Sequence, residues 1–365
     1  MTGAADRPVP PKGGFRDLRV VARIAESRLI TSFHLQSADG ASLPTFQPGQ
    51  FLALRIPSDG PEGTVLRHYS LSGSPDDQGH YRISVKREGA GGTAGRGSSW
   101  LHDHVQVGSV LSADGPRGAF VLDQTSDRPV VLISGGVGLT PMVAMLHTLA
   151  SRSDRAATFL HACDCGDLHA LRDEVDGIVA QRPGLAAHYC YRAPDAADRA
   201  DGRFHSEGML TRTVLQAVLP LDDYDFYLCG PPPFMQATYQ TLRGLGVAAN
   251  RIAYEFFGPA TVLDADPAPV PVSVVAAAPS GAITVEFRKS GVTVPWDDAA
   301  SSLLAFAEDQ GLRPDFSCRA GVCGTCISRI VAGDVSYVED PLDEPDQGQI
   351  LLCCAKPATS IVLDL

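Results

Sequence analysis

Several cysteines near the C-terminus have a spacing that suits an iron–sulfur centre. Cys318, Cys323 and Cys326 form a C-x4-C-x2-C run, and a fourth thiol, Cys353 or the adjacent Cys354, follows in a returning segment. This spacing is typical of a [2Fe-2S] cluster, whose two irons need four thiolate ligands. Zinc sites usually carry two C-x2-C pairs, and the sequence lacks the second pair. The pattern therefore predicts a [2Fe-2S] cluster and leaves the fourth ligand open between two neighbours.

A second group of residues suits a flavin. The string Arg67-His68-Tyr69-Ser70 places a cation, aromatic rings and a hydroxyl on one expected strand, where they can meet a phosphate, the isoalloxazine ring and its reactive nitrogen. Such a string is weak alone, but a Gly/Ser loop that could receive a phosphate opens a helix further on. We expect Ser70 to contact the reacting ring, and we expect these residues to bind the flavin: Arg67, His68, Tyr69, Ser70, Val85, Lys86, Gly97, Ser98 and Ser99.

Glycines directly after an apolar strand indicate a dinucleotide site. The glycines allow the backbone to approach a pyrophosphate, and the following helix offers free N–H groups. A later strand ends in Cys229, where a small thiol could contact a nicotinamide, since ligands bind at the carboxyl ends of parallel strands. An ordinary glycine-rich turn and a plain buried thiol are the alternatives. The expected contacts are Gly136, Gly138, Thr140, Pro141, Cys229, Gly230 and Pro231.

The patterning along the chain predicts a multidomain protein that could position these groups. Short alternating strands over 15–124 predict an antiparallel β-barrel, and strands alternating with helices over 125–262 predict a doubly wound α/β domain. An Ala/Pro-rich linker is expected over 263–281, and an α+β domain with the cysteines over 282–365. Residues 1–14 are expected to form a disordered tail.

Composition narrows the classes of function. The net charge of −12 over 365 residues argues against nucleic acid as a partner, and no apolar run is long enough to span a membrane. Nine cysteines without a secretion signal predict a reducing compartment, and we expect the cytoplasm. The last 84 residues carry 13 Asp/Glu and 6 Lys/Arg. This acidity indicates either solubility alone or a docking face for a basic partner.

Together these motifs and the segment 255–259 (EFFGP) resemble the ferredoxin–NADP reductase superfamily. Residues 15–262 most resemble the reductase half of flavohaemoglobins, and the order of domains resembles the reductase components of Rieske-type oxygenases, with a C-terminal plant-type ferredoxin (β-grasp) domain. The resemblance implies FAD, with FMN as the alternative, and places Glu255 and Phe257 close to the flavin ring. It also implies Cys353 as the fourth ligand, because the ligand of plant-type ferredoxins ends an apolar strand and precedes two small residues. The expected catalytic contacts are then Ser70, Cys229 and Glu255.

The segment after the second α/β strand favours NADH over NADPH. A 2′-phosphate needs a cation, and residues 161–167 contain none, while Asp164 would repel the phosphate; Arg192 or Arg203 could still fold in. We therefore expect electrons to pass from NADH through the flavin and the [2Fe-2S] cluster, singly, to a separate terminal oxygenase. The alternatives are a reductase for a haem or hybrid-cluster protein in nitrogen-oxide chemistry, and a redox-sensing electron carrier.

Overall fold

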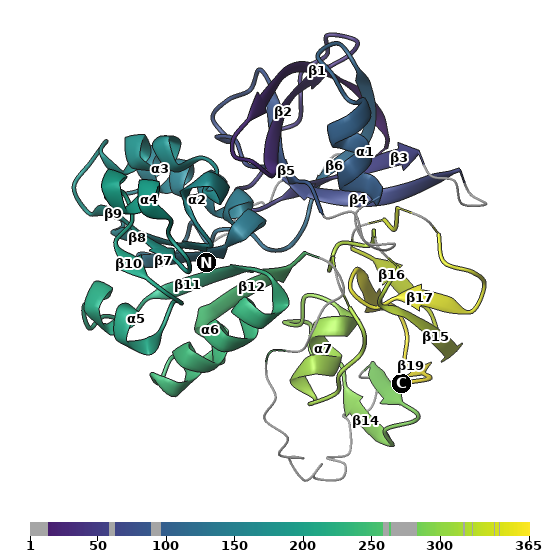
Figure 1. The fold of residues 1–365 in the computed structure, drawn as a ribbon. Helices are drawn as coiled ribbons and strands as arrows, with labels where there is room; N and C mark the ends of the chain where they lie inside the picture. The colour runs from purple at the N-terminus through teal and green to yellow at the C-terminus, as the bar shows by residue number, and fades with distance from the viewer. Residues whose placement is uncertain are drawn as a thin grey trace. The chain divides into compact units, whose positions relative to one another are not determined.

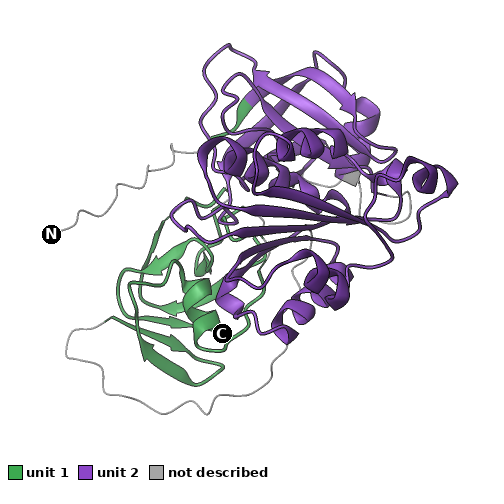
Figure 2. Cartoon of the chain, turned by 90° about the vertical axis from the view of Figure 1, so that its left-hand side faces the viewer, with its two compact units in different colours: residues 1–16, 268–365 green, residues 17–267 purple. Residues whose placement is uncertain are grey.

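The computed structural model describes residues 14–57, 63–88, 96–257, 263, 283–316, 318–322, 324–338, 340–342 and 344–365. The chain divides into two compact units, residues 17–267 and residues 268–365 with 1–16 (Figure 2). The expected tail and linker lie outside the described residues except for Gly14 and Leu263, so both stay predictions. Every helix in the described ranges is too short or too polar to cross a bilayer.

The first domain is an antiparallel sheet in the order β4-β3-β6-β1-β2-β5 (Figure 1). A bridge between Leu71 and Ile83 joins the two outer strands, so the sheet closes into a barrel. Alternate residues such as Leu18 and Val20 point inward and are fully buried, as the period of two requires. The elements are β1 (Arg16–Ala25), β2 (Ile30–Ser37), β3 (Phe51–Pro57), β4 (Thr64–Ser70), β5 (Tyr81–Lys86), α1 (Arg96–His104) and β6 (Val110–Arg117).

The second domain is a parallel sheet in the order β10-β9-β8-β7-β11-β12 (Figure 1). Every residue of β7 is buried, because α2 and α3 pack on one face of the sheet and α5 and α6 on the other. The strands are β7 (Val130–Gly135), β8 (Ala157–Cys163), β9 (Leu185–Tyr191), β10 (Ser206–Glu207), β11 (Asp225–Gly230) and β12 (Ile252–Phe256). The helices are η1 (Gly136–Gly138), α2 (Leu139–Arg152), η2 (Gly166–Leu168), α3 (Arg172–Val179), α4 (Ala196–Asp201), α5 (Arg212–Val218), α6 (Pro232–Gly244) and η3 (Ala249–Arg251).

The C-terminal domain combines a mixed sheet, in the order β14-β13-β19-β15-β17, with helix α7. The expected hairpin forms between β13 and β14, and β13 also pairs in parallel with β19. Ser302 begins α7 by accepting a hydrogen bond from the N–H of Ala305. The elements are β13 (Thr284–Phe287), β14 (Val292–Pro295), α7 (Leu303–Asp309), β15 (Ile327–Ala332), β16 (Val335–Tyr337), β17 (Gln349–Leu351), β18 (Ala355–Pro357) and β19 (Ile361–Leu363).

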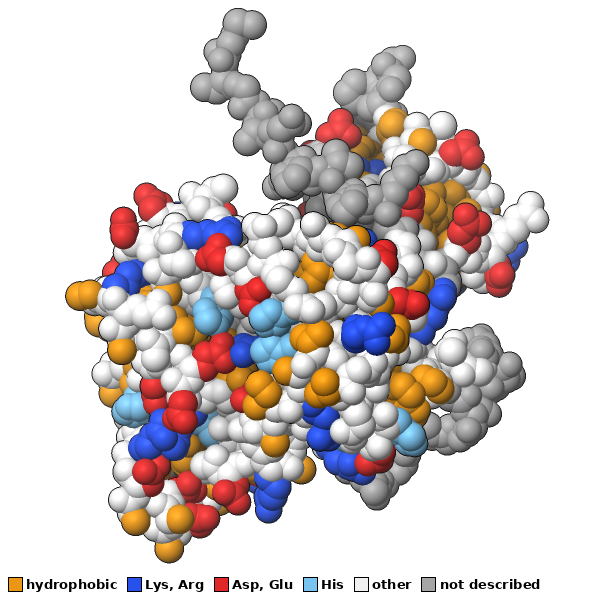
Figure 3. Space-filling view, turned by 90° about the horizontal axis from the view of Figure 1, so that it is seen from above, with side chains coloured by type: hydrophobic (Ala, Val, Ile, Leu, Met, Phe, Trp, Pro, Cys, Tyr) orange, Lys and Arg blue, Asp and Glu red, His pale blue; other side chains and the backbone are white. Residues whose placement is uncertain are grey.

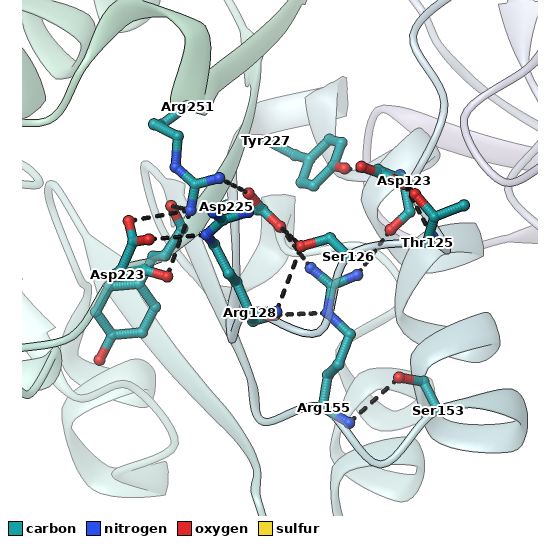
Figure 4. Close-up of polar contacts among 11 residues, drawn as sticks. Asp123, Thr125, Ser126, Arg128, Ser153, Arg155, Asp223, Asp225, Tyr227 and Arg251 are labelled. Carbon is teal, nitrogen blue, oxygen red and sulfur yellow. Dashed lines mark hydrogen bonds and ion pairs between the residues drawn. The ribbon is translucent and has the colours of Figure 1, made fainter.

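A charged network fixes the segment that leads from the barrel into β7 (Figure 4). Arg155 is buried and binds the carboxylate of Asp225 at 2.7 Å and the carbonyl of Asp123 at 2.7 Å. Arg251 reaches the other oxygen of Asp225 at 2.7 Å, and the hydroxyl of Tyr227 accepts from the N–H of Asp123. These contacts lie at the amino ends of β7 and β11. They therefore hold the sheet from the side opposite to the expected dinucleotide site.

Candidate functional site

Strand β4 carries four residues expected to meet the flavin. It pairs antiparallel with β3, so its side chains alternate between two faces and Ser70 lies opposite Phe51. Arg67 and Tyr69 share one face, whereas His68 and Ser70 share the other. His68 stacks on Phe51, with ring centroids 4.8 Å apart. The structure therefore brings the cation and the tyrosine ring together and directs the serine to the opposite face.

The Ser70 hydroxyl is the buried polar group that tests whether a flavin fits. Its oxygen has no hydrogen-bond partner among the described residues. The barrel hydroxyls of Ser32, Ser72 and Ser84, by contrast, are linked to one another at 2.7–2.8 Å. A buried hydroxyl left unpaired costs about 1–3 kcal/mol. A polar ring edge would supply the missing bond, so Ser70 suits the expected flavin contact.

Arg67 passes directly over the first turn of α1. A Cβ added at Gly97 would lie 2.7 Å from Cγ of Arg67 and 3.2 Å from Cδ1 of Ile56, so a larger residue would force the arginine stem to shift. The guanidinium donates to the carbonyl of Leu66 at 2.7 Å and makes no ion pair within the described ranges. A cation beside the free N–H groups of a helix start is suited to a phosphate.

The two serines of the α1 start hold the backbone at Glu88. The hydroxyl of Ser98 accepts from the N–H of Glu88 at 3.2 Å, and the hydroxyl of Ser99 donates to the Glu88 carbonyl at 3.5 Å. Lys86, at the end of β5, pairs with the Glu88 carboxylate at 3.4 Å. These three expected flavin residues therefore all contact Glu88, which follows the end of β5.

Val85 is tied to α1 through His102. The Nε2–H of His102 donates to the Val85 carbonyl at 2.9 Å, because a carbonyl can only accept. Burial lowers the pKa of His102, so its ring is neutral near pH 7 and its Nδ1 accepts from the Thr31 hydroxyl at 3.5 Å. The side chain of Val85 itself belongs to the barrel core.

The glycines after β7 form a turn with open space above it. Gly136 has φ +54°, and a Cβ placed there would meet nothing within 4 Å. Glycine is needed at position 138 for a different reason. A Cβ added to Gly138 would lie 2.3 Å from the carbonyl oxygen of Cys229. The turn can therefore receive a pyrophosphate on its open side while it rests against the end of β11.

The helix after this turn begins at Leu139, so Pro141 occupies its third position. The Thr140 hydroxyl donates to the Val137 carbonyl at 3.1 Å. Both side chains are buried. Thr140 and Pro141 therefore build the turn, and the glycine backbone is left to face a ligand.

Cys229 lies at the carboxyl end of β11, between Ser134 on β7 and Glu255 on β12. Its side chain is fully buried. Burial, followed by the Glu255 carboxylate, raises the pKa of the Cys229 thiol well above its ordinary value. The thiol is therefore neutral and small, which suits a contact with an uncharged ring better than nucleophilic chemistry. Phe257 follows β12 and is 39% exposed.

Phe234 is a site residue that the sequence analysis missed. Cβ atoms added at Gly135 and Gly230 would lie 2.8 Å and 2.7 Å from its ring, so one phenyl ring covers the carboxyl ends of both β7 and β11. Pro231 is exposed and precedes α6, which carries this ring. The run of prolines before Phe234 was the available signal, since it fixes the start of a helix.

An ion pair lies in the segment from which the sequence predicts NADH rather than NADPH. Arg192 Nε donates to Asp164 Oδ1 at 2.8 Å where β8 and β9 end. Arg203 does not reach this site, because it pairs instead with Asp173 and Asp176. A cation is therefore present, but a carboxylate neutralises it. This arrangement supports NADH.

The cysteine loop presents backbone N–H groups to sulfur. The N–H groups of Ala320 and Val322 donate to Cys318 Sγ at 3.4 Å, and that of Gly321 donates to Cys353 Sγ at 3.3 Å. Gly321 and Gly324 have φ +67° and +70°, which glycine adopts without strain. Donors of this kind stabilise thiolates and suit an iron–sulfur centre.

Cys353 lies beside the cysteine loop, because its Sγ accepts the hydrogen bond from the Gly321 N–H at 3.3 Å. Cys354 turns its own S–H toward the Leu351 carbonyl at 3.7 Å. This geometry supports Cys353 as the fourth ligand, and Cys323 lies outside the described residues. The thiol set fits a [2Fe-2S] cluster.

Three family models match the three domains. They are the oxidoreductase FAD-binding domain over residues 17–122, the oxidoreductase NAD-binding domain over 132–240 and the 2Fe-2S iron-sulfur cluster binding domain over 285–358. The flavin site, the dinucleotide turn and the thiol set lie within these three matches. They define the class as an oxidoreductase that binds FAD, NAD and a [2Fe-2S] cluster.

Relatives identify the family more closely. A flavohemoprotein of Bacillus thuringiensis subsp. konkukian is 43% identical over 257 residues, which are 69% of this chain and 64% of the relative. The flavohem-like FAD/NAD-binding domain of a nitric oxide dioxygenase from Vibrio cholerae O1 biovar El Tor is 40% identical, with a TM-score of 0.59, over 67% of this chain and 99% of that domain. The chain therefore belongs to the flavohemoprotein-like reductases of the ferredoxin–NADP reductase superfamily.

A third similarity extends over the C-terminal domain as well. Phthalate dioxygenase reductase is 25% identical, with a TM-score of 0.56, over 96% of this chain and 98% of that protein. It is described as a modular structure for electron transfer from pyridine nucleotides to [2Fe-2S]. The chain spans less than two thirds of the length of the curated flavohemoproteins that it matches.

Proposed function

We propose that this chain is an NADH-dependent reductase that passes electrons singly, through FAD and a [2Fe-2S] cluster, to a partner oxygenase. One observation carries the proposal: the similarity to phthalate dioxygenase reductase spans 96% of this chain and all three of its matched domains. When bound, the flavin would convert the electron pair of one hydride into two single electrons, and the cluster would supply one-electron transfer.

The protein's own residues bind, orient and shield the flavin and the dinucleotide. Arg67 and the first turn of α1 hold a flavin phosphate, and Ser70 completes its hydrogen bonds at the ring. Gly136 and Gly138 give a pyrophosphate its place after β7. Cys229 places a small neutral side chain at the end of β11. Because positioning is the chief contribution of these groups, no side chain has to move a proton in the hydride step.

Cys353→Ser tests the order of the path. We expect the variant to lose cluster iron and the reduction of a one-electron protein acceptor such as cytochrome c, while NADH-to-ferricyanide turnover at the flavin survives. Cys354→Ser is the matched control and should keep both activities, because that thiol faces the Leu351 carbonyl. Loss of both activities together in Cys353→Ser would show that the sequential path is wrong.

A haem or hybrid-cluster partner in nitrogen-oxide chemistry is the second candidate. It is favoured by the 40% identity to the FAD/NAD-binding domain of a nitric oxide dioxygenase. The two candidates differ in the acceptor that accelerates NADH oxidation. Purified chain mixed with a Rieske-type oxygenase or with a single-domain globin, with cluster-free Cys353→Ser alongside, separates them. Faster turnover with the globin alone would overturn the oxygenase proposal.

A further inference from the structure

The cysteine loop contains an arginine in a conformation that favours glycine. Arg319 directly follows Cys318 and has φ +51°. Gly321 and Gly324, the other residues with positive φ among those of the loop that the structure describes, carry no side chain to crowd the backbone. A non-glycine residue pays a steric cost in this region, so surrounding contacts must hold it there.

The Arg319 side chain is held by two groups of its own domain. Its guanidinium binds the carboxylate of Glu308 with two bonds, Nη1 to Oε2 at 2.8 Å and Nη2 to Oε1 at 2.6 Å. It also lies over the ring of Phe316, with Cζ 3.8 Å from the ring centroid. The two charged side chains are only 32% and 29% exposed. A bidentate, stacked arginine of this kind has a single well-defined position.

Helix α7 contacts two segments of the C-terminal domain, the one that carries Cys318 and the one that carries Cys353. From its first turn, the N–H of Leu304 donates to the carbonyl of Leu352, the residue before Cys353, at 2.9 Å. From its last turn, Glu308 binds Arg319, the residue after Cys318. The helix therefore connects two sulfur-bearing segments that are far apart in the sequence.

We propose that Arg319 and Glu308 are positioning residues for the iron–sulfur centre: the pair fixes the loop conformation that aims the Cys318 thiol, and its two opposite charges balance each other so that neither shifts the reduction potential of the cluster. This inference rests on the proposed ligands Cys318 and Cys353. It deepens the proposed function by assigning control of the cluster to residues that do not bind iron.

The charges of the pair have opposite and separable effects. Reduction adds one negative charge to the cluster, so a nearby cation favours the reduced form and a nearby anion opposes it. While the pair is intact, Glu308 neutralises Arg319. Removing the carboxylate leaves the cation uncompensated, and removing the guanidinium leaves the anion uncompensated.

Potentiometric titration of the full-length holoprotein, followed by the electron paramagnetic resonance signal of the reduced cluster, tests the proposal without interference from flavin absorbance. We expect Glu308→Gln to shift the midpoint potential upward and Arg319→Gln to shift it downward. The double variant should return toward the wild-type potential. A pair that only supported the fold would move both single variants in the same direction, and that result would overturn the proposal.

A second series of variants separates the effect of the backbone conformation at position 319 from the effect of the positive charge. Arg319→Gly removes the charge but adopts positive φ freely, so we expect it to hold its iron against a chelator longer than Arg319→Gln while keeping the downward shift. Arg319→Lys keeps the positive charge, so we expect its midpoint potential to lie close to that of the wild-type protein. The controls Asp309→Asn and Arg329→Gln remove the same charges at exposed positions of this domain.

Shifts in the controls as large as those in the pair would refute the electrostatic role, and equal loss of iron from the glycine and glutamine variants would refute the backbone role. Wild-type protein that holds no iron would instead refute the ligand assignment. The two failures are therefore distinguishable.

Discussion

Replacing Glu174 with Gln should loosen the join between the flavin-binding barrel and the NAD-binding domain. Glu174, on α3, accepts two bonds from Arg82 of β5, at 2.6 and 2.8 Å, and one from Nε2–H of His147 on α2 at 2.6 Å. Arg82 is in turn fixed by the carbonyl and hydroxyl of Ser72. One carboxylate thus connects a barrel strand to two helices of the other domain.

The magnitude follows from the pKa of Glu174. Burial alone would raise it, but hydrogen bonds from His147 and Arg82 outweigh burial and lower the pKa from 4.5 to about 2. At about 1.36 kcal/mol per pH unit, this difference corresponds to about 3 kcal/mol. The carboxylate is 26% exposed, so screening by solvent reduces the expected net loss to about 2 kcal/mol.

The sign of the pH dependence is fixed by the same values. A carboxyl whose folded-state pKa is depressed stabilises the fold above its unfolded pKa, and the stabilisation is lost as the pH falls from about 4.5 toward 2. The gap in free energy of unfolding between wild type and Glu174→Gln should therefore be constant near neutral pH and shrink below about pH 4.5. NADH-to-ferricyanide turnover should also fall, because the hydride must cross between the two joined domains.

Urea unfolding at pH 7, 5 and 4, followed by tryptophan fluorescence and flavin release, measures this gap. Asp173→Asn is the matched control on the same helix, since Asp173 is 84% exposed and pairs with Arg203 within its own domain. We expect the control to lie within about 0.5 kcal/mol of wild type. A Glu174→Gln variant as stable as this control at pH 7, or a gap that widens in acid, would refute the reasoning.

Further substitutions test the dinucleotide site and the charged network. Gly138→Ala should weaken NADH binding at least tenfold, measured by NADH fluorescence, because its Cβ would lie 2.3 Å from the Cys229 carbonyl; unchanged affinity would contradict the close approach. Asp164→Asn should raise kcat/KM for NADPH about tenfold by releasing Arg192, a gain of about 1.4 kcal/mol; no gain would show that this pair lies away from the ribose. Arg155→Leu should cost about 3 kcal/mol of unfolding free energy in urea, because it leaves a buried carboxylate short of a partner; a loss under 1 kcal/mol would show that the remaining contacts suffice.

The cofactor-binding motifs were predictable from the sequence because each of them lies within a short run of residues. The cysteine spacing and the glycines after an apolar strand constrain a few consecutive residues, and the family models confirm the FAD-, NAD- and [2Fe-2S]-binding domains. The β-barrel was predicted from strands in which apolar and polar residues alternate, and the parallel sheet was predicted from strands that are apolar throughout. The roles of single residues such as Ser70 and Cys229 stay predictions.

Other features could not be predicted because the interacting partners are distant in sequence. Arg82 and Glu174 are 92 positions apart, and neither stands in a motif. Phe234 covers Gly135 across a strand pairing that no local pattern announces. The conformation of Arg319 contradicts the local expectation, since a residue with positive φ would be expected to be glycine.

The arginines show most clearly why placement decides function. By residue type alone, Arg67, Arg192 and Arg319 could each bind a phosphate. Arg192 is paired with Asp164, and Arg319 is paired with Glu308, so their charges are already neutralised. Arg67 makes no ion pair within the described part of the chain, and its stem crosses the first turn of α1. A phosphate would therefore gain most at Arg67, and this supports its assignment to the flavin.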